Sequence, residues 1–192
     1  GSSEGLQIVL PELMHLREIH LDGNQLGDTG MQHVADGIAG LQTISRGNKV
    51  IGYLEEKSES SWSHAGVRVL DLSDNGVLQA GLKAVTSTVG TLRGLRALHL
   101  SRMTLRDEGA LRLAEHFPAL RELCVLHLDS NMFNPEGIRA ICAVLPASLI
   151  ELNLSQNNLS TVGAEALAAA LRSLGSLEVL ELSDTRLHEA VS

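Results

Sequence analysis

The apolar positions of this chain follow one repeated pattern, L-x-x-L-x-L-x-x-N-x-L-x-x-x-G-x-x-x-L-x-x-x-L. The clearest copy begins at Leu149 and ends at Leu171. Further copies begin at Leu16, Val67, Leu95, Leu123 and Leu177, and successive starts along the chain are 51, 28, 28, 26 and 28 residues apart. A fixed period of this length predicts structural repeats that stack on one another.

Each copy changes its hydrophobic period halfway. Its first half alternates, as in Leu152 and Leu154, which predicts a short strand. In its second half the positions recur every four residues, as in Gly163, Leu167 and Leu171, which predicts a helix. A single strand and helix cannot bury their own apolar faces, so neighbouring copies must share one core. We therefore predict an α/β fold, a right-handed leucine-rich repeat solenoid with parallel strands on the concave side and helices on the convex side.

Polar positions in the turns add detail to this prediction. We expect the asparagine at the ninth position to bond backbone groups that the turn after the strand leaves unpaired. This asparagine is present as Asn24, Asn75, Asn131 and Asn157. The third copy has Met103 instead, which cannot make such bonds, so a looser turn is expected there. Asn134 and Pro135 predict a helix start, with Asn134 as the capping residue.

On these residues the chain resembles the ribonuclease-inhibitor-like class of leucine-rich repeats. That class includes ribonuclease inhibitor, the Ran GTPase-activating protein and the sensor regions of NOD-like receptors. The resemblance covers residues 6–191 except 40–66. It implies a surface for binding another protein. The alternative that it implies is a GTPase-activating protein similar to the Ran activator, although no catalytic residue of that protein can be placed on this sequence.

Domain organisation follows from the repeat spacing. Residues 1–3 are typical of a cloning remnant, so the prediction is one domain of about six repeats over residues 4–192, truncated at both ends. The interval of 51 residues contains an insertion, placed at 41–66. Its Ser- and Glu-rich composition favours a flexible loop. The alternative is a binding element, because it contains the chain's only tyrosine and tryptophan, Tyr53 and Trp62.

Strand residues that alternate with the leucines should face solvent on the concave side. The fifth positions are His20, Asp71, His99, His127, Asn153 and Glu181, and the seventh positions include Asp22, Ser101, Asp129 and Ser155. Asp71, His99 and His127 would form a row that could hold zinc. The alternative is a row of solvated polar residues, since side chains on neighbouring strands diverge. No nucleophile elbow or phosphate-binding glycine motif accompanies Ser101 or Ser155.

Composition limits the classes of function. The net charge of −8 argues against nucleic acid as a partner. No apolar run is long enough for a membrane helix, and no cofactor-binding pattern is found. Two unpatterned cysteines, Cys124 and Cys142, favour free thiols and an intracellular, cytoplasmic protein.

These observations predict a non-catalytic protein-interaction module, a scaffold or sensor arm, whose concave face binds another protein with a basic surface. The oligomeric state is left open. The predicted binding residues are Glu18, His20, Asp22, Asp71, Asp74, His99, Arg102, His127, Asp129, Glu151, Asn153, Glu181 and Asp184, with Tyr53 and Trp62 as possible secondary contacts.

Overall fold

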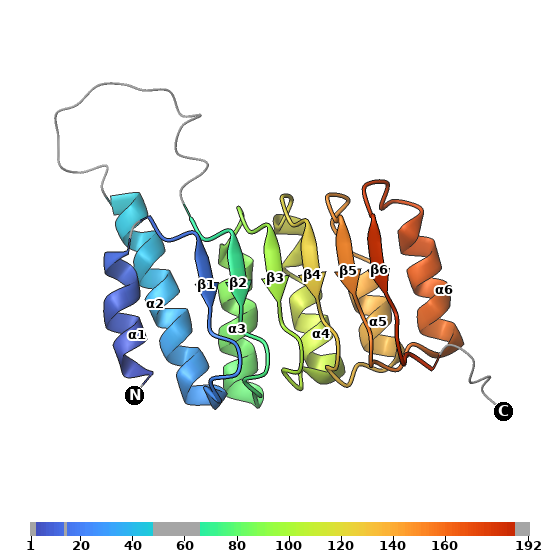
Figure 1. The fold of residues 1–192 in the computed structure, drawn as a ribbon, viewed down its shortest axis with the longest axis horizontal. Helices are drawn as coiled ribbons and strands as arrows, with labels where there is room; N and C mark the ends of the chain where they lie inside the picture. Colours follow the sequence, from blue (N-terminus) through green and yellow to red (C-terminus); the bar gives the residue numbers. More distant parts are fainter. Residues whose placement is uncertain (1–2, 14, 48–65, 187–192) are drawn as a thin grey trace, which may run out of the picture.

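The computed structural model describes residues 3–13, 15–47 and 66–186, and within them it shows one layer of strands and one layer of helices (Figure 1). The strands pair in parallel, in the order in which they occur in the chain. They are β1 (Glu18–His20), β2 (Val69–Asp71), β3 (Ala97–His99), β4 (Val125–His127), β5 (Glu151–Asn153) and β6 (Val179–Glu181). The predicted strand positions and parallel order are confirmed.

Helices cover one face of this sheet (Figure 1). The helical elements are α1 (Glu4–Val9), α2 (Gly27–Gly47), α3 (Gln79–Thr91), α4 (Arg106–Ala114), α5 (Pro135–Cys142) and α6 (Ser160–Leu171), with short 3₁₀ helices η1 (Leu10–Glu12) and η3 (Phe117–Ala119). The opposite face, which the helices leave uncovered, is called the open face below. None of the described helices has the length and apolar character needed to cross a membrane. The predicted α/β leucine-rich repeat solenoid is confirmed.

The core runs as one continuous layer between the strands and the helices. The central residues of β2 to β5 are in register, and the Leu70, Leu98, Leu126 and Leu152 side chains are each 0 % exposed. In β6 the corresponding Leu180 is 36 % exposed, because no described element packs beyond this strand. The last strand thus lacks the packing that a further repeat gives to β2 to β5.

The ninth-position asparagines connect neighbouring repeats. Oδ1 of Asn131 accepts hydrogen bonds from the backbone N–H groups of Met103 and Leu105 in the preceding repeat, at 3.0 and 3.4 Å. Its Nδ2 donates to the carbonyl oxygen of Leu100, at 2.7 Å, and to that of Leu128 within its own repeat, at 3.0 Å. Asn75 and Asn157 do the same. The predicted role is therefore confirmed at these three positions.

Two predictions about these turns are wrong. The Asn24 side chain is exposed and donates only to the carbonyl oxygen of Asp22, because the described residues include no earlier strand whose turn it could bridge. The turn at Met103 is not loosened. Arg102 there has φ +53°, close to the +57° of Ser130 in the next repeat, and Met103 is fully buried. The N–H groups of Met103 and Leu105 in this turn are bonded by Asn131 of the following repeat, as in the other turns.

Helix α5 begins with Pro135 at its first turn, as predicted, but Asn134 makes no side-chain cap bond. Its backbone N–H instead donates to Oδ1 of Asp107, at 2.7 Å, and its Nδ2 donates to Oδ2 of the same carboxylate, at 3.2 Å. Asp28 accepts from the N–H of Leu78 in the same way, at 2.7 Å. An aspartate near the start of one helix thus bonds the loop before the next helix.

A helix precedes the first repeat: α1 packs beside α2, and η1 places Leu10 in the core. Helix α2 continues to Gly47, so the first part of the insertion placed at 41–66 is helical. Most of that insertion, including Tyr53 and Trp62, lies outside the described residues.

Candidate functional site: the open face of the sheet

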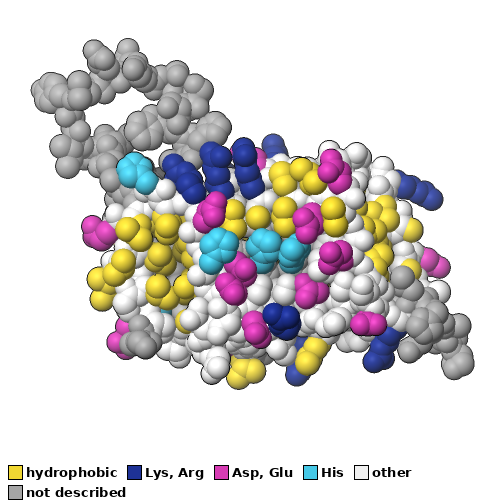
Figure 2. All heavy atoms as spheres, viewed as in Figure 1, with side chains coloured by type: hydrophobic (Ala, Val, Ile, Leu, Met, Phe, Trp, Pro, Cys, Tyr) yellow, Lys and Arg dark blue, Asp and Glu magenta, His cyan; other side chains and the backbone are white. Residues whose placement is uncertain are grey.

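The in-register pairing of the strands brings equivalent repeat positions together on the open face. Val69 lies opposite Ala97, Ala97 opposite Val125, and His99 opposite His127. Each repeat position therefore forms a row that crosses the strands. Figure 2 shows basic side chains along the upper edge of the face, a hydrophobic row and a short histidine row below them, and acidic side chains among and below these rows.

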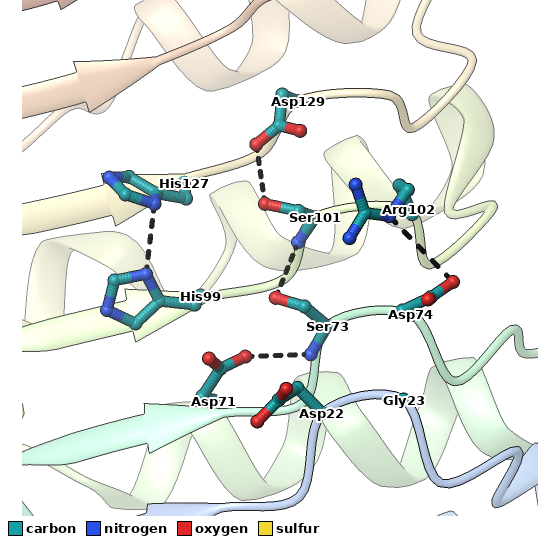
Figure 3. Close-up of a pocket in the computed structure, with 10 residues that line it drawn as sticks. All are labelled: Asp22, Gly23, Asp71, Ser73, Asp74, His99, Ser101, Arg102, His127 and Asp129. Atoms are coloured by element: carbon teal, nitrogen blue, oxygen red, sulfur yellow. Dashed lines mark hydrogen bonds and ion pairs between the residues drawn. The ribbon is translucent and has the colours of Figure 1, made fainter.

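A recess of about 260 Å³ lies where strands β1 to β4 end (Figure 3). It is lined by Asp22, Gly23, Asp71, Ser73, Asp74, His99, Ser101, Arg102, His127 and Asp129. Seven of these are predicted site residues that come from four consecutive repeats. The lining contains four carboxylates and one guanidinium, so its formal charge is −3 while the histidines are neutral.

The polar groups of this recess are held by hydrogen bonds. Oδ1 of Asp71 accepts the N–H of Ser73, at 2.9 Å, and Oγ of Ser73 accepts the N–H of Ser101, at 3.2 Å. The hydroxyl of Ser101 donates to Asp129. Figure 3 shows this ladder running from one repeat to the next. Ser73 and Ser101 therefore hold the side chains of Asp71 and Asp129 in place, a role that the sequence did not predict.

Arg102 is the one basic side chain of the recess. It lies 3.8 Å from Asp74 in an exposed ion pair. Such a pair is weak, because water screens both charges. Its backbone is left-handed, with φ +53°. Every repeat has this conformation at the same position, which directs the chain from the strand into the turn.

His99 and His127 form the middle of the histidine row. Their Nδ1 atoms are 3.0 Å apart, so one of these atoms donates a proton and the other accepts it. The rings meet edge to face, with centroids 4.5 Å apart. Nε2 of His127 lies 2.8 Å from Oε1 of Glu151 on the next strand. A chain of hydrogen bonds thus joins three repeats across the open face.

The pKa of His99 is lowered from its ordinary value, first by burial and then by the neighbouring His127. The carboxylates of Asp71 and Glu151 oppose this shift, because they favour the protonated ring. The net direction of the pKa is nevertheless downward from the ordinary value of 6.5. His99 is therefore neutral at pH 7.

The structure changes the interpretation of metal-ligating residues. Asp71 does not form a group with His99 and His127, since these histidines bond each other. In the described part of the chain, the grouping of three possible ligands is His20, Asp22 and Asp71, whose ligand atoms lie within 4.8 Å of one another. His20 and Asp22 are exposed, and Asp71 already accepts a backbone hydrogen bond. Solvated polar positions explain this grouping, and we assign it no metal.

The remaining predicted residues lie outside the recess. Glu18 and His20 form an exposed pair on β1, at 3.5 Å. Asn153 donates to Oε2 of Glu181, at 2.7 Å, on the last two strands. Asp184 lines a second recess, beside Met132 and Arg186, after β5 and β6. The thirteen predicted residues therefore share one face but form separate groups along it.

Sequence reasoning missed one feature of this face. Arg17, Arg68 and Arg96 occupy the position directly before β1, β2 and β3, and they stack through backbone bonds from Arg68 N to Arg17 O and from Arg96 N to Arg68 O. Figure 2 shows basic side chains side by side along this edge. Because the residues directly before the strands were not considered, the face was expected to carry a single arginine, Arg102. We call this set the arginine column.

Comparisons with known proteins agree with the fold. The protein-family model described as "Leucine Rich repeat" matches residues 12–35 and 146–168. Human Protein NLRC5 is 31 % identical over 212 residues, which cover 96 % of this chain and 10 % of that protein. Bovine NLR family CARD domain-containing protein 4 is 32 % identical over 108 residues, covering 55 % of this chain and 11 % of that protein. The chain thus spans about a tenth of the length of these relatives.

A shorter relative is pig ribonuclease inhibitor, 29 % identical over 91 % of this chain and 34 % of its own length. Among solved structures, the tropomodulin C-terminal domain of Caenorhabditis elegans superposes with a TM-score of 0.50 at 12 % identity, over 95 % of this chain and 83 % of that one, which shows likeness of fold alone. Strand order, the bridging asparagines and these matches agree: the chain folds as a leucine-rich repeat solenoid and resembles the proteins of the ribonuclease-inhibitor-like class.

Proposed function

We propose that this chain is a non-catalytic protein-interaction module of a larger protein, a scaffold or sensor arm, and that its partner binds the open face through basic groups. The observation that carries the proposal is the acidic recess, whose four carboxylates come from three of the repeats. Hydrogen bonds hold two of them, Asp71 and Asp129, in place before a partner arrives. Such preorganisation lowers the ordering cost of binding.

The physical chemistry of the recess favours a protein partner with lysine or arginine side chains. A recess of about 260 Å³ is small for a whole ligand and admits the end of a side chain. Its formal charge of −3 attracts cations and would repel phosphate groups. This is the reason why we propose neither nucleic acid nor an anionic membrane as the partner of this region.

We also propose a reducing, intracellular location. Cys124 and Cys142 are free thiols in the structure. Burial raises the pKa of the Cys142 thiol to about 12, so it stays protonated and unreactive. Two unpaired thiols fit a compartment that keeps cysteines reduced.

The test compares proteins captured from a cell extract by the wild-type chain and by two variants of equal net charge. The open-face variant carries Asp71→Asn, Asp129→Asn and Glu181→Gln, which keep the side-chain shape and much of the hydrogen bonding. The control carries Glu115→Gln, Glu136→Gln and Glu165→Gln, three exposed positions on or beside the helices. Bound proteins are quantified by isotope-labelled mass spectrometry.

We expect the open-face variant to bind its specific partners about tenfold more weakly, which corresponds to about 1.4 kcal/mol. The control should retain them. Capture should also weaken as salt is raised, because exposed charges are screened over a Debye length of about 8 Å at physiological ionic strength. Equal capture by the wild type and the open-face variant, with unchanged circular dichroism, would refute binding at the recess.

A further inference from the structure

The arginine column forms a basic edge beside the acidic recess. The register places Arg17, Arg68 and Arg96 on three adjacent strands, so their backbones are separated by about 4.8 Å per step and about 10 Å from first to last. Among the described residues, Arg96 of the column forms an ion pair with Glu122. The charged groups are 3.5 Å apart, and both side chains are about half exposed. A pair of this kind contributes little and is readily exchanged for a partner's carboxylate.

A hydrophobic row lies next to the arginine column. Val69, Ala97 and Val125 occupy the first position of β2, β3 and β4 and are aligned by the strand register. All three are partly exposed on the open face. Glu18 and Glu151 occupy the same row on β1 and β5 and bound its continuous apolar part on β2, β3 and β4. In Figure 2 the hydrophobic band lies directly below the basic side chains.

These two rows fit one kind of occupant. We propose that the arginine column and the Val69–Ala97–Val125 row bind an acidic amphipathic helix of a partner protein, lying across the strands. The carboxylates of the helix pair with the three guanidinium groups, which can bind them through two parallel hydrogen bonds. Its apolar side chains cover the hydrophobic row.

The spacing of the column favours a helix over an extended segment. Residues i, i+3 and i+7 of a helix lie on one face and are about 4.5 and 10.5 Å apart along the axis, because each residue rises about 1.5 Å. The arginine backbones are separated by about 4.8 and 10 Å in the same direction. Alternate residues of an extended segment are about 6.6 and 13 Å apart, so its carboxylates would leave the column after two pairs.

This inference rests on the proposed function, in that both use the open face of an interaction module. It adds a second charge requirement, because the partner must carry carboxylates towards the amino-terminal ends of the strands and basic groups towards the recess. Carboxylates are preferred to phosphates as the anions, since the hydrophobic row requires apolar neighbours and the recess beyond it repels polyanions.

The probe is a synthetic alanine-based peptide of about 15 residues, long enough for measurable helicity. It carries Glu at i, i+3 and i+7 and Leu on the adjoining stripe. A second peptide has the same composition with these positions scrambled. Fluorescence anisotropy measures the binding of each to the 192-residue chain. The column variant carries Arg17→Gln, Arg68→Gln and Arg96→Gln. The control carries Arg112→Gln, Arg139→Gln and Arg172→Gln, which change the net charge equally on the helix layer.

We expect the patterned peptide to bind the wild type at least about tenfold more tightly than it binds the column variant, and the control to match the wild type. The scrambled peptide should bind more weakly to all of them. No binding to the wild type, equal binding to the column variant, or equal binding of both peptides would overturn the inference.

The open-face acidic variant separates this result from the proposed function. Removing the charges of Asp71, Asp129 and Glu181 should leave the affinity for the acidic peptide unchanged or raise it, because it removes repulsion. If the column variant binds the peptide normally while captured proteins still depend on these carboxylates, the helix proposal fails and the proposed function stands. If the column variant loses the peptide but capture does not depend on these carboxylates, the proposed function fails and the helix proposal stands.

Discussion

Asn131 shows how single residues hold this solenoid together, because its amide is 0 % exposed and serves two repeats at once. Replacing it with alanine leaves the N–H groups of Met103 and Leu105 and the carbonyl of Leu100 without partners. A buried unpaired polar group costs about 1–3 kcal/mol. We expect Asn131→Ala to lower the free energy of unfolding in urea by about 3 kcal/mol or more.

The matched control is Asn24→Ala, at the same repeat position in the first copy. Asn24 is exposed and its side chain bonds only one nearby carbonyl. We expect the free energy of unfolding to fall by no more than about 0.5 kcal/mol, as for most surface substitutions. Equal losses at the two positions would show that the bridging role of the buried amide is not the source of stability.

His99 gives the chain a pH dependence of known sign. Its pKa is lowered in the folded protein, mainly by burial, so the unfolded chain takes up the proton first as pH falls. The stability that His99 contributes is therefore full above the unfolded value of about 6.5 and is lost as pH falls below it towards the folded pKa. His99→Gln should remove this part of the pH dependence. Urea unfolding at pH 8 and pH 5.5 measures it, with the exposed His15→Gln as control.

If wild type and His99→Gln lose the same free energy of unfolding between these pH values, the histidine pair is not coupled to folding. His99→Gln also separates charge from hydrogen bonding at the pair, since glutamine can still bond Nδ1 of His127 but does not titrate.

At the scale of whole elements, the helices stack closely because small residues lie at their contacts. A Cβ atom on Gly137 of α5 would come 2.5 Å from Oδ1 of Asp107 and 3.1 Å from Cβ of Ala110 on α4. Asp107 cannot move away freely, because the same oxygen accepts the N–H of Asn134. Gly137→Ala should therefore destabilise the protein by about 1–3 kcal/mol, as overpacking does.

Gly94→Ala is the control for this change, since nothing lies within 4 Å of a Cβ built there. Its effect on the free energy of unfolding should stay within about 0.5 kcal/mol. Thermal and urea unfolding of the two variants compare them directly. A Gly137→Ala variant as stable as the wild type would show that α4 and α5 can separate at no cost.

Elements were predictable from the sequence wherever the core repeats. Each buried leucine has an equivalent one repeat away, so the strands and their order followed from the pattern. The arginine column did not, because its position lies outside the strand alternation and its members are 51 and 28 residues apart. The bonds of Asp107 to Asn134 were missed for a different reason. They join two repeats, whereas a helix cap is a local motif.

The whole molecule is a stack of repeats, and its largest departure from the period can be removed in register. In α2 the buried residues Met31, Val34, Ile38 and Leu41 match Leu82, Val85, Val89 and Leu92 in the next repeat, 51 positions later. Deleting residues 43–65 restores the 28-residue interval and puts Leu41 three positions before Val67, as Leu92 stands before Leu95. The insertion proposed as a flexible loop would then be dispensable.

We expect this deletion to change the free energy of unfolding by less than about 1 kcal/mol, because the cost of closing a loop grows only slowly with its length. The measurement is urea unfolding with circular dichroism, together with capture of the same proteins as the wild type. A deletion that unfolds the chain would identify the insertion as a packed element. Loss of capture alone would assign binding to Tyr53 and Trp62.

The central claim is that the open face is the interaction surface, and site-specific photo-crosslinking tests it most directly. A photoreactive phenylalanine analogue replaces Ala97, at the middle of the open face, or Leu111, which is 46 % exposed on α4. The account predicts crosslinks to a cellular protein from position 97. An excess of unlabelled wild type should compete and abolish them, whereas an excess of the open-face variant should leave them in place. Crosslinks to that protein from position 111 and none from 97 would contradict it.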